Sequence, residues 1–188
     1  GRCSILDTIW VCSSSDFEFE CDFLIPEGSC DKVSLTYNTF TDLIEYDLIN
    51  QQWNFRFGSG GTEFFGVSAT TKFDTGDWVS IKVVTRVGSF DVYINGSATP
   101  EYSGSGVINV FNGNQFGRVN SGTPNTTPKL YMRNIKLTDV GTTSNSKYWK
   151  LNEQLGLRIS DYSQDTNGVV TKDMSFIDNW AYLPNEGY

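Results

Sequence analysis

Three carboxylates alternate along one short stretch of this 188-residue chain: Glu18, Glu20 and Asp22 in the run D-F-E-F-E-C-D-F. In an extended strand, residues two apart point to the same side, so all three carboxylates would share one face. Two carboxyl groups about 5 Å apart can serve as the nucleophile and the acid/base of a retaining glycoside hydrolase. The same pattern also suits a solvated strand face, or an edge strand whose charges prevent aggregation. Both interpretations stay open at this point.

A second polar group comes from three consecutive runs between residues 32 and 57. Each run alternates apolar and polar residues, and the polar positions are Thr36, Asn38, Glu45, Asp47, Gln52, Asn54 and Arg56. If the three runs are neighbouring strands, these side chains cover one sheet surface. Carboxylates, amides and a guanidinium supply the directional donors and acceptors that sugar hydroxyls need. We therefore predict Glu45, Asp47, Asn54 and Arg56 as ligand-binding residues, with an ordinary wet sheet face as the alternative.

Further candidates are aromatic or lie near predicted loops. Tyr93 and Tyr131 fall off the apolar parity of their strands, where a ring can stack on a sugar or pack against a neighbouring chain. Tyr102 is expected in a loop, and Arg118 and Asn120 are expected on a rim with several Asn-rich turns. Loops on a rigid scaffold commonly carry binding sites, so Tyr102, Arg118 and Asn120 complete the predicted ligand-binding set.

The composition argues against several classes of function. The chain has no histidine, so a serine or cysteine triad lacks its usual base, and no Gly-rich phosphate loop opens a helix. The formal net charge of -8 and the lack of a basic patch disfavour nucleic acids and anionic membranes as partners. No apolar run approaches the roughly 20 residues of a membrane span, so we expect no membrane insertion. Neutral or cationic ligands remain open.

The four cysteines, at positions 3, 12, 21 and 30, have a regular spacing of nine. A two-residue turn at Asp7-Thr8 would place Cys3 opposite Cys12 on adjacent strands, where disulfide distances can be met. The alternative is reduced cysteines packed as small hydrophobic residues, which the apolar parity of Cys21 favours at that position. A zinc site is disfavoured because the chain has neither C-x-x-C nor histidine.

The elements that would position these residues are all strands. Residues 78–96 alternate with period two on both sides of a Gly88-Ser89 turn, which predicts a long β-hairpin. Further strands are expected at residues 16–26, 32–38, 42–48, 52–57, 63–68, 107–110, 115–120 and 130–139. No stretch of ten or more residues has a convincing helical pattern with caps. Many short strands with frequent turn signals predict an all-β sandwich.

The hairpin and its downstream strand resemble the core of concanavalin A-like, laminin-G-like jelly rolls. The matching pieces are W-V-S-I-K-V-V (78–84), F-D-V-Y-I-N-G (90–96), F-G-R (116–118) and L-Y-M-R-N-I-K-L-T-D (130–139), with D-F-E-F-E-C-D-F as a first core strand. The resemblance spans most of residues 16–139. It implies an antiparallel jelly-roll β-sandwich that binds rather than catalyses. Related jelly rolls often bind calcium, so calcium stays open as a cofactor, with Asp74 and Asp77 as candidates and a capped turn as the alternative.

Residues 1–140 are expected to form the sandwich, and residues 141–188 a linker and a C-terminal extension that packs on it or on a neighbouring chain. The run Y-W-K-L-N-E-Q-L-G-L-R-I-S-D-Y-S from Tyr148, with Trp180 later, is similar to segments found beside such jelly rolls in bacteriophage tail and bacterial surface proteins.

This second resemblance implies a non-catalytic carbohydrate- or receptor-binding module of a phage tail protein or surface adhesin. Its place would be extracellular or on a virion surface, and its partner a cell-surface glycan or receptor. One alternative is a structural or assembly module of a fibre, for which a homotrimer is an open arrangement. The other is a jelly-roll polysaccharide hydrolase that uses Glu18 and Glu20.

Overall fold

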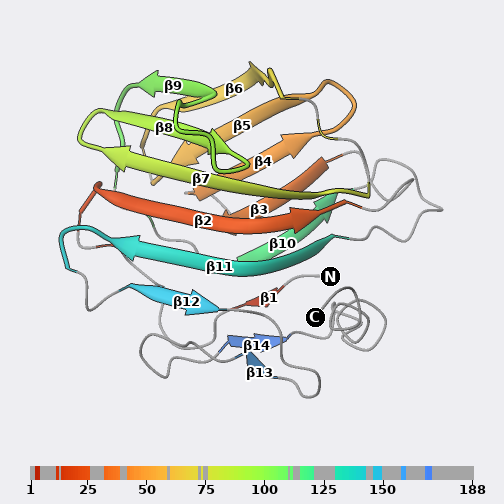
Figure 1. The fold of residues 1–188 in the computed structure, drawn as a ribbon. Helices are drawn as coiled ribbons and strands as arrows, with labels where there is room; N and C mark the ends of the chain where they lie inside the picture. Colours follow the sequence, from red (N-terminus) through yellow and green to blue (C-terminus); the bar gives the residue numbers. More distant parts are fainter. Residues whose placement is uncertain are drawn as a thin grey trace.

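The computed structural model describes residues 3–4, 12, 14–25, 32–38, 42–58, 60–71, 73, 76–109, 111, 115–120, 130–142, 146–149, 158–159 and 168–170. These residues form strands, turns and loops and contain no helix, and Figure 1 shows the strands arranged as two layers. Within this part of the chain, therefore, no helix is long and apolar enough to cross a membrane.

The layer at the front of Figure 1 is a six-stranded antiparallel sheet with the order β12-β11-β2-β7-β8-β9. Its strands are β2 (Phe17–Leu24), β7 (Trp78–Arg86), β8 (Ser89–Ile94), β9 (Tyr102–Ser105), β11 (Tyr131–Asp139) and β12 (Lys147–Trp149). The predicted hairpin is confirmed as β7 and β8, which pair from Ile81↔Ile94 to Arg86↔Ser89, but its turn is at Val87-Gly88 rather than at the predicted Gly88-Ser89.

The second layer is an eight-stranded antiparallel sheet with the order β13-β14-β1-β10-β3-β4-β5-β6. Its strands are β1 (Cys3–Ser4), β3 (Lys32–Asn38), β4 (Asp42–Asp47), β5 (Gln52–Phe57), β6 (Glu63–Ser68), β10 (Gln115–Asn120), β13 (Arg158–Ile159) and β14 (Gly168–Val170). The all-β antiparallel sandwich that the alternation predicts is confirmed. The short strands β12, β13 and β14, which come after residue 140, thus belong to the two sheets.

The core lies between the sheets and is largely aromatic. The residues of β2 alternate strictly between buried and half-buried, because every second side chain points to the opposite sheet. Phe17 meets Phe57 edge to face at 5.9 Å between ring centroids, and Phe23 meets Trp53 in the same way at 6.4 Å. Burial of each large apolar side chain stabilises the fold by about 1.5–3 kcal/mol, so these cross-sheet pairs fix the two layers together.

A bulge in β3 corrects one sequence prediction. Ser34 lies opposite Glu45, but the next pair in register is Thr36 with Ile44, whose side chain is in the core. The extra residue shifts the parity of the strand, so Thr36 is fully buried opposite an inward-facing residue. The prediction that Thr36 belongs to the outer polar face was therefore wrong.

A second bulge, in β11, decides which of its side chains face outward. Arg133 pairs with Asp22 and Lys136 pairs with Glu20, although the two basic residues are three positions apart. Asn134 has a positive φ of 52°, and the following Ile135 is buried in the core. The extra residue thus keeps both Arg133 and Lys136 on the outer side of the six-stranded sheet.

The cysteine predictions have different outcomes. Cys3 pairs with Phe116 on one side and Val170 on the other, so it cannot also face Cys12 across a short hairpin. Cys21 lies on β2 opposite Ile81 of β7, and its side chain is buried in the core. Burial raises the pKa of its thiol well above the usual value, and the nearby Asp22 charge adds a smaller effect in the same direction. The interpretation of Cys21 as a small hydrophobic core residue is confirmed. Cys30 lies outside the described residues.

Candidate functional site

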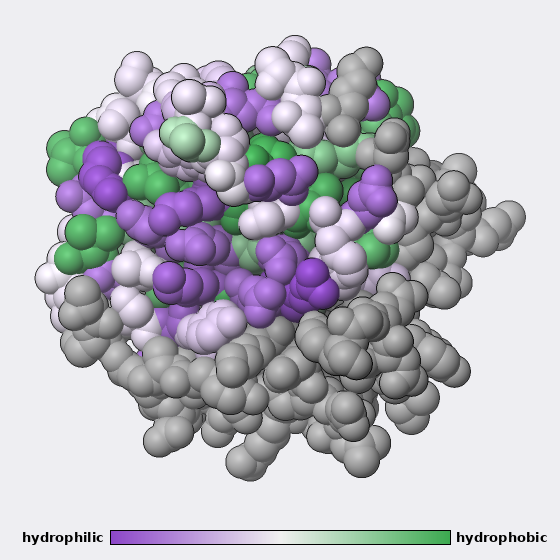
Figure 2. All heavy atoms as spheres, viewed as in Figure 1, coloured by the Kyte–Doolittle hydropathy of each residue, from purple (hydrophilic) through white to green (hydrophobic). Residues whose placement is uncertain are grey.

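The outer side of the six-stranded sheet carries a ladder of charged side chains, which we call the charged face. It consists of Glu18, Glu20 and Asp22 from β2, Lys82 and Arg86 from β7, Asp91 from β8, and Arg133 and Lys136 from β11. Figure 2 shows hydrophilic residues gathered over the middle of this view. The face arises from parity, because the odd positions of β2 and β7 are in the core and the even ones point away from it.

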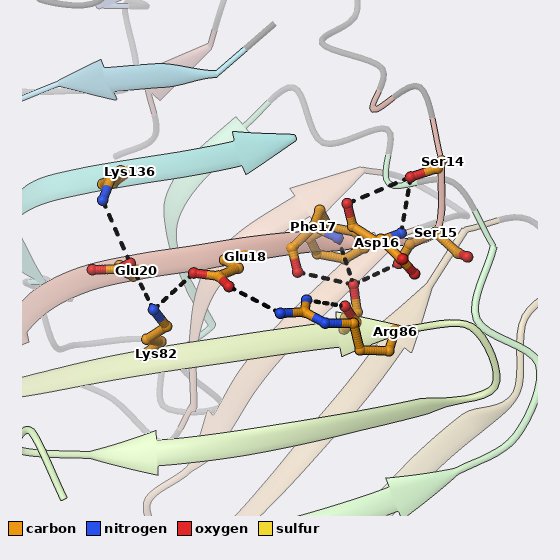
Figure 3. Close-up of polar contacts among 10 residues, drawn as sticks. Ser14, Ser15, Asp16, Phe17, Glu18, Glu20, Lys82, Arg86 and Lys136 are labelled. Carbon is orange, nitrogen blue, oxygen red and sulfur yellow. Dashed lines mark hydrogen bonds and ion pairs between the residues drawn. The ribbon is translucent and has the colours of Figure 1, made fainter. Parts of the chain in front are cut away.

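The register places opposite charges on adjacent strands. Glu20 pairs with Lys82 on one side and Lys136 on the other, and Tyr93 of β8 continues this row beyond Lys82. Lys82 Nζ lies 2.7 Å from Glu18 Oε2 and 3.3 Å from Glu20 Oε1, while Lys136 Nζ is 3.7 Å from the same Glu20 oxygen (Figure 3). One ammonium group thus joins both glutamates of the predicted carboxylate run.

Arg86 closes this network at the end of β7. Its Nη2 donates to Glu18 Oε1 at 3.2 Å, and its Nη1 donates to the backbone oxygen of Thr85 at 2.6 Å. The buried Thr85 hydroxyl accepts the Phe17 N–H at 3.0 Å and donates to the Ser15 oxygen at 2.6 Å. These bonds tie the start of β2 to the end of β7, which fixes Glu18 beside Arg86 (Figure 3).

The neighbouring charges control the protonation of Glu18. Partial burial acts to raise its pKa, but the hydrogen bonds and charges of Lys82 and Arg86 outweigh burial and hold the pKa below its ordinary value. The hydrogen bond to Glu18 is the main cause that raises the pKa of Lys82. A catalytic acid needs a raised pKa so that it keeps its proton near neutral pH. Glu18 is therefore held as a carboxylate, which disfavours it as the acid of a hydrolase.

A hollow of about 490 Å³ opens on the charged face between β2, β7 and β8. It is lined by Glu18, Glu20, Ser80, Lys82, Val84, Arg86, Tyr93, Gly96 and Ser97. The volume is within the range of about 300–1,000 Å³ that is usual for small-molecule sites. Charged groups, hydroxyls and one aromatic ring thus meet in a single depression.

Sequence reasoning found only part of this hollow. It selected Glu18, Glu20 and Tyr93, but it passed over Lys82 and Arg86, which sit on the polar parity of the hairpin strand W-V-S-I-K-V-V-T-R. The signal was therefore present in the same alternation that predicted the strand. What the alternation lacked was the register that places Lys82 between two glutamates.

A hydrogen-bonded chain extends the charged face beyond the hollow. Asp22 Oδ2 accepts bonds from Arg133 Nε at 3.1 Å and from Asn134 Nδ2 at 2.8 Å. The Tyr148 hydroxyl of β12 donates to Asn134 Oδ1 at 3.2 Å. The Arg133 guanidinium lies over the Trp78 ring at 4.0 Å from its centroid, which is a cation–π contact.

The predicted residues Glu45 and Asp47 lie on the outer side of the other sheet. Glu45 is only 8% exposed and Asp47 only 4%. Glu45 accepts bonds from Asn54 Nδ2 at 2.9 Å and Ser34 Oγ at 3.3 Å, and Asp47 accepts the Asn50 N–H at 2.9 Å. Burial acts to raise the pKa of Asp47, but its bonds to Asn50 and Lys32 outweigh burial and lower that pKa.

Asn54 and Arg56 share this surface with Glu45 and Asp47, as the sequence predicts. Asn54 pairs with Glu45 in register, and its Oδ1 accepts the Gly66 N–H at 2.9 Å. Arg56 forms an ion pair with Glu63 and lies 5.9 Å from the centre of the Phe65 ring. The surface is thus assembled, but the protein itself engages its polar groups, and its role in ligand binding stays a prediction.

The other three predicted ligand-binding residues are distributed differently. Tyr102 lies in β9 rather than in a loop, and its ring packs near Phe90 and Phe55 at 5.6 and 6.3 Å between centroids. Arg118 and Asn120 lie on β10, in register with Ser34 and Lys32. They therefore continue the rows of Glu45 and Asp47, while their side chains lie outside the described part of the chain.

Only one of the two predicted calcium ligands, Asp77, lies in the described part of the chain. Asp74 is outside the described residues, and Asp77 is an exposed residue in the bend before β7. Among the residues that the structure describes, no three Asp, Glu, Cys or His side chains are grouped so that they could hold a metal ion. The calcium site stays a prediction.

Comparison of the sequence with protein-family models gives no match, and comparison with curated protein sequences gives none. Comparison with solved structures finds a Bacteroides ovatus protein ascribed a carbohydrate-binding role, with 16% identity and a TM-score of 0.60 over 89% of this chain. This chain spans 55% of that protein's length. The likeness supports the β-sandwich fold.

Two more distant structures also match. One is the carbohydrate-binding module CBM66 from Bacillus subtilis, with 15% identity and a TM-score of 0.37 over 55% of this chain and 72% of that one. The other is domain 4 of a GH43 extracellular arabinanase from Geobacillus stearothermophilus in complex with arabinotriose. It has 20% identity and a TM-score of 0.41 over 66% of this chain and 61% of that one.

Proposed function

We propose that this chain is a non-catalytic carbohydrate-binding module and that its glycan binds in the hollow on the charged face. The observation that carries the proposal is the lining of the hollow, to which Lys82, Glu20, Arg86 and Tyr93 all contribute, with Lys82 directly opposite Tyr93 in register. Each sugar hydroxyl donates and accepts hydrogen bonds, so it fits between an ammonium and a carboxylate, while a ring can cover an apolar sugar face.

A binding role fits the charges better than a hydrolytic role. The carboxylate of Glu18 is held ionised by Lys82 and Arg86, and Glu20 lies 3.3 Å from the same ammonium group. The setting of Glu18 does not resemble that of a carboxyl group kept protonated by apolar surroundings, as glycosidase acids are. The carbohydrate-binding role ascribed to the Bacteroides ovatus protein is an analogy of fold, which supports the proposal without assigning the site.

The setting we propose for this module is a bacteriophage tail protein or a bacterial surface adhesin, extracellular or on a virion, with a cell-surface glycan as partner. The support is the sequence resemblance of the segment from Tyr148. A trimer in a larger fibre is part of this proposal. Native mass spectrometry of the purified chain tests it, and a strict monomer at micromolar concentration would count against it.

The glycan site is tested with a bacterial glycan array followed by calorimetry, with and without calcium. We expect Tyr93→Ala and Lys82→Met each to weaken binding about tenfold or more, which corresponds to about 1.4 kcal/mol. The matched control is Phe65→Ala, because Phe65 is an exposed aromatic residue on the other sheet. The proposal fails if the wild-type chain binds no glycan, or if Phe65→Ala weakens binding as much as Tyr93→Ala.

A further inference from the structure

Arg133 is held in one orientation by contacts from two directions. Its guanidinium lies 4.0 Å from the centre of the Trp78 ring, and its Nε donates to Asp22 Oδ2 at 3.1 Å. Stacking on a ring and a directed bond at Nε together fix the plane of the guanidinium. An arginine fixed in this way loses little further side-chain entropy when it binds a ligand.

The support behind Arg133 is itself held in place. Asn134 donates to the same Asp22 oxygen, and the Tyr148 hydroxyl donates to Asn134. Asn134 has a left-handed backbone, with φ of 52°, at the bulge of β11. Bulges with such a residue are frequent beside functional sites, where they redirect a side chain. Here the bulge directs Arg133 across Asp22 toward β7.

The terminal nitrogens of Arg133 are available to a ligand. Its contacts in the described part of the chain use Nε and the flat face of the guanidinium, and no described residue accepts a bond from either terminal nitrogen. The side chain is 31% exposed. Two parallel N–H groups at the end of a guanidinium match the two oxygens of a carboxylate, and such bidentate pairs are among the strongest hydrogen bonds.

The register places Arg133 in the same cross-strand row as Ser80 of the hollow, because Arg133 pairs with Asp22 and Asp22 pairs with Ser80. Trp78, over which it stacks, is two residues before Ser80 on the same side of β7, and Ser80 lines the hollow. Residues two apart in a strand are separated by about 7 Å, which is within the length of one or two sugar units. A glycan that fills the hollow can therefore extend to Arg133.

The local charge also permits an anion here. The chain carries a net charge of -8, but on the charged face Lys82, Arg86, Arg133 and Lys136 balance Glu18, Glu20, Asp22 and Asp91. Asp22 is paired with Arg133, and Glu18 and Glu20 are both paired with Lys82. The chain-wide charge led us to expect neutral or cationic ligands, yet this face is neutral, and no described residue occupies the guanidinium fork of Arg133.

We infer that the glycan bound on the charged face contains a uronic acid, and that the terminal nitrogens of Arg133 bind its carboxylate while the hollow holds an adjoining sugar. The inference rests on the proposed function, because it assigns a chemical class to the ligand of that same site. It makes Arg133 the residue that distinguishes acidic from neutral sugars.

The experiment uses the full chain and oligosaccharides of glucuronic, galacturonic and mannuronic acid, each with its carboxyl-reduced counterpart. The two members of a pair differ only at C6, so calorimetry of each pair isolates the contribution of the carboxylate. We expect the chain to bind at least one acidic member about tenfold more tightly than its reduced counterpart. Arg133→Lys keeps the charge but loses the bidentate fork, so it should bring this ratio close to one.

Lys32→Gln is the control for net charge, since Lys32 lies on the other sheet, and it should keep the preference for the acidic sugar. Circular dichroism and thermal melting confirm that each variant is folded. A wild-type ratio near one, or a ratio that Arg133→Lys leaves unchanged, overturns the inference. If reduced sugars bind as well as acidic ones and Tyr93→Ala weakens both, this inference fails and the proposed function stands. If no glycan binds at all, both fail.

Discussion

Glu18 shows how neighbouring residues decide what one carboxylate can do. The sequence places it in a run that could be catalytic, but Lys82 and Arg86 lower its pKa and hold it as an anion. Its carboxylate oxygens are then better suited to accept hydrogen bonds from hydroxyl groups than to donate a proton. The partners that decide this come from β7, more than 60 residues away in the chain.

The pH dependence of stability tests this electrostatic arrangement. Because the folded-state pKa of Glu18 lies below its unfolded value near 4.5, its ion pairs stabilise the fold above that value and are lost as the pH falls through the folded pKa. The raised pKa of Lys82 acts at the other extreme: its contribution is present below about 10.5 and is lost at higher pH. Both effects leave stability from this pair intact near neutral pH.

We expect Glu18→Gln to reduce the free energy of unfolding by about 0.2–1 kcal/mol at pH 7, because the pairs are partly exposed to solvent. The difference from the wild-type chain should narrow as the pH falls below about 4.5, where the Glu18 carboxylate takes up a proton. Urea unfolding at pH 7, 4 and 3 measures this, with Asp77→Asn as an exposed control outside the network. A difference that stays constant over this range would show that the ion pairs contribute nothing.

Residue types and parity located the candidate side chains, but they did not show which of them already have hydrogen-bond or ion-pair partners within the protein. Alternation correctly put Glu45, Asp47, Asn54 and Arg56 on one surface. It could not show that Asn54, Ser34 and Lys32 already engage the Glu45 carboxylate. Those contacts depend on rotamers and on the pairing of three strands, which a single sequence does not encode as a local pattern.

At the scale of elements, β9 shows where strand prediction failed. The strand Y-S-G-S has no branched aliphatic residue, so no alternation marks it, whereas V-I-N-V at residues 107–110 looks like a strand. Residues 107–109 form no strand, and Val110 lies outside the described residues. The Thr62 N–H bonds to Val107 and the Asn109 N–H bonds to Phe57, so this segment bridges two parts of the other sheet as a loop.

Gly104 explains why β9 has so weak a pattern. A Cβ atom at this position would overlap the ring of Phe90, which is buried in the core and lies on the neighbouring strand. The close approach of β9 to that ring therefore requires glycine, although glycine is a poor strand former. Packing against an aromatic ring overrides the local preference of the residue.

We expect Gly104→Ala to destabilise the protein by about 1–3 kcal/mol, since the Phe90 ring can move only by disturbing the core. The control is Ser105→Ala on the same strand, because Ser105 is exposed and pairs with Ser89 at the sheet edge. Urea unfolding of the three proteins gives the comparison. Equal midpoints for Gly104→Ala and Ser105→Ala would mean that β9 adjusts freely, contrary to the packing described.

Bulges are the second feature that alternation misses. A single extra residue reverses the faces of the rest of a strand, so Thr36 is buried and Arg133 and Lys136 share one side. Residue type gives little warning of a bulge. In β11 the residue with positive φ is Asn134, not a glycine. The candidate Arg133 subsite depends on that bulge and could not be predicted from the sequence.

At the scale of the molecule, the fold was more predictable than the site. Burial of alternate residues in eight- and nine-residue strands specifies two facing sheets, and the aromatic contacts between them follow from that pattern. The proposed function depends instead on one face, whose charges balance while the chain as a whole is strongly acidic. A net charge describes the average surface, and a binding site is a local departure from it.

The segment after residue 140 connects the two levels. We expected an extension, and β12 pairs with β11 at Ile135↔Trp149, Lys136↔Tyr148 and Leu137↔Lys147. This pairing covers the edge of β11 and brings the Tyr148 hydroxyl to Asn134, which supports Asp22 and Arg133. The stability of the sheet and the proposed preference for acidic sugars should therefore both depend on β12 (Lys147–Trp149).

Two shortened chains test this connection. A chain that ends at residue 150 retains β12, and one that ends at residue 142 lacks it, while both lack β13 and β14. Since a backbone hydrogen bond contributes about 0.5–1.5 kcal/mol, we expect the longer chain to be more stable by about 1–3 kcal/mol. Tyr148→Phe in the full chain separates the two effects, because it keeps the β12 pairing but removes the bond to Asn134. It should weaken the preference for uronic acids with little loss of stability. Equal urea midpoints for the two shortened chains would exclude a structural role for β12, and an unchanged preference in Tyr148→Phe would exclude its support of Arg133.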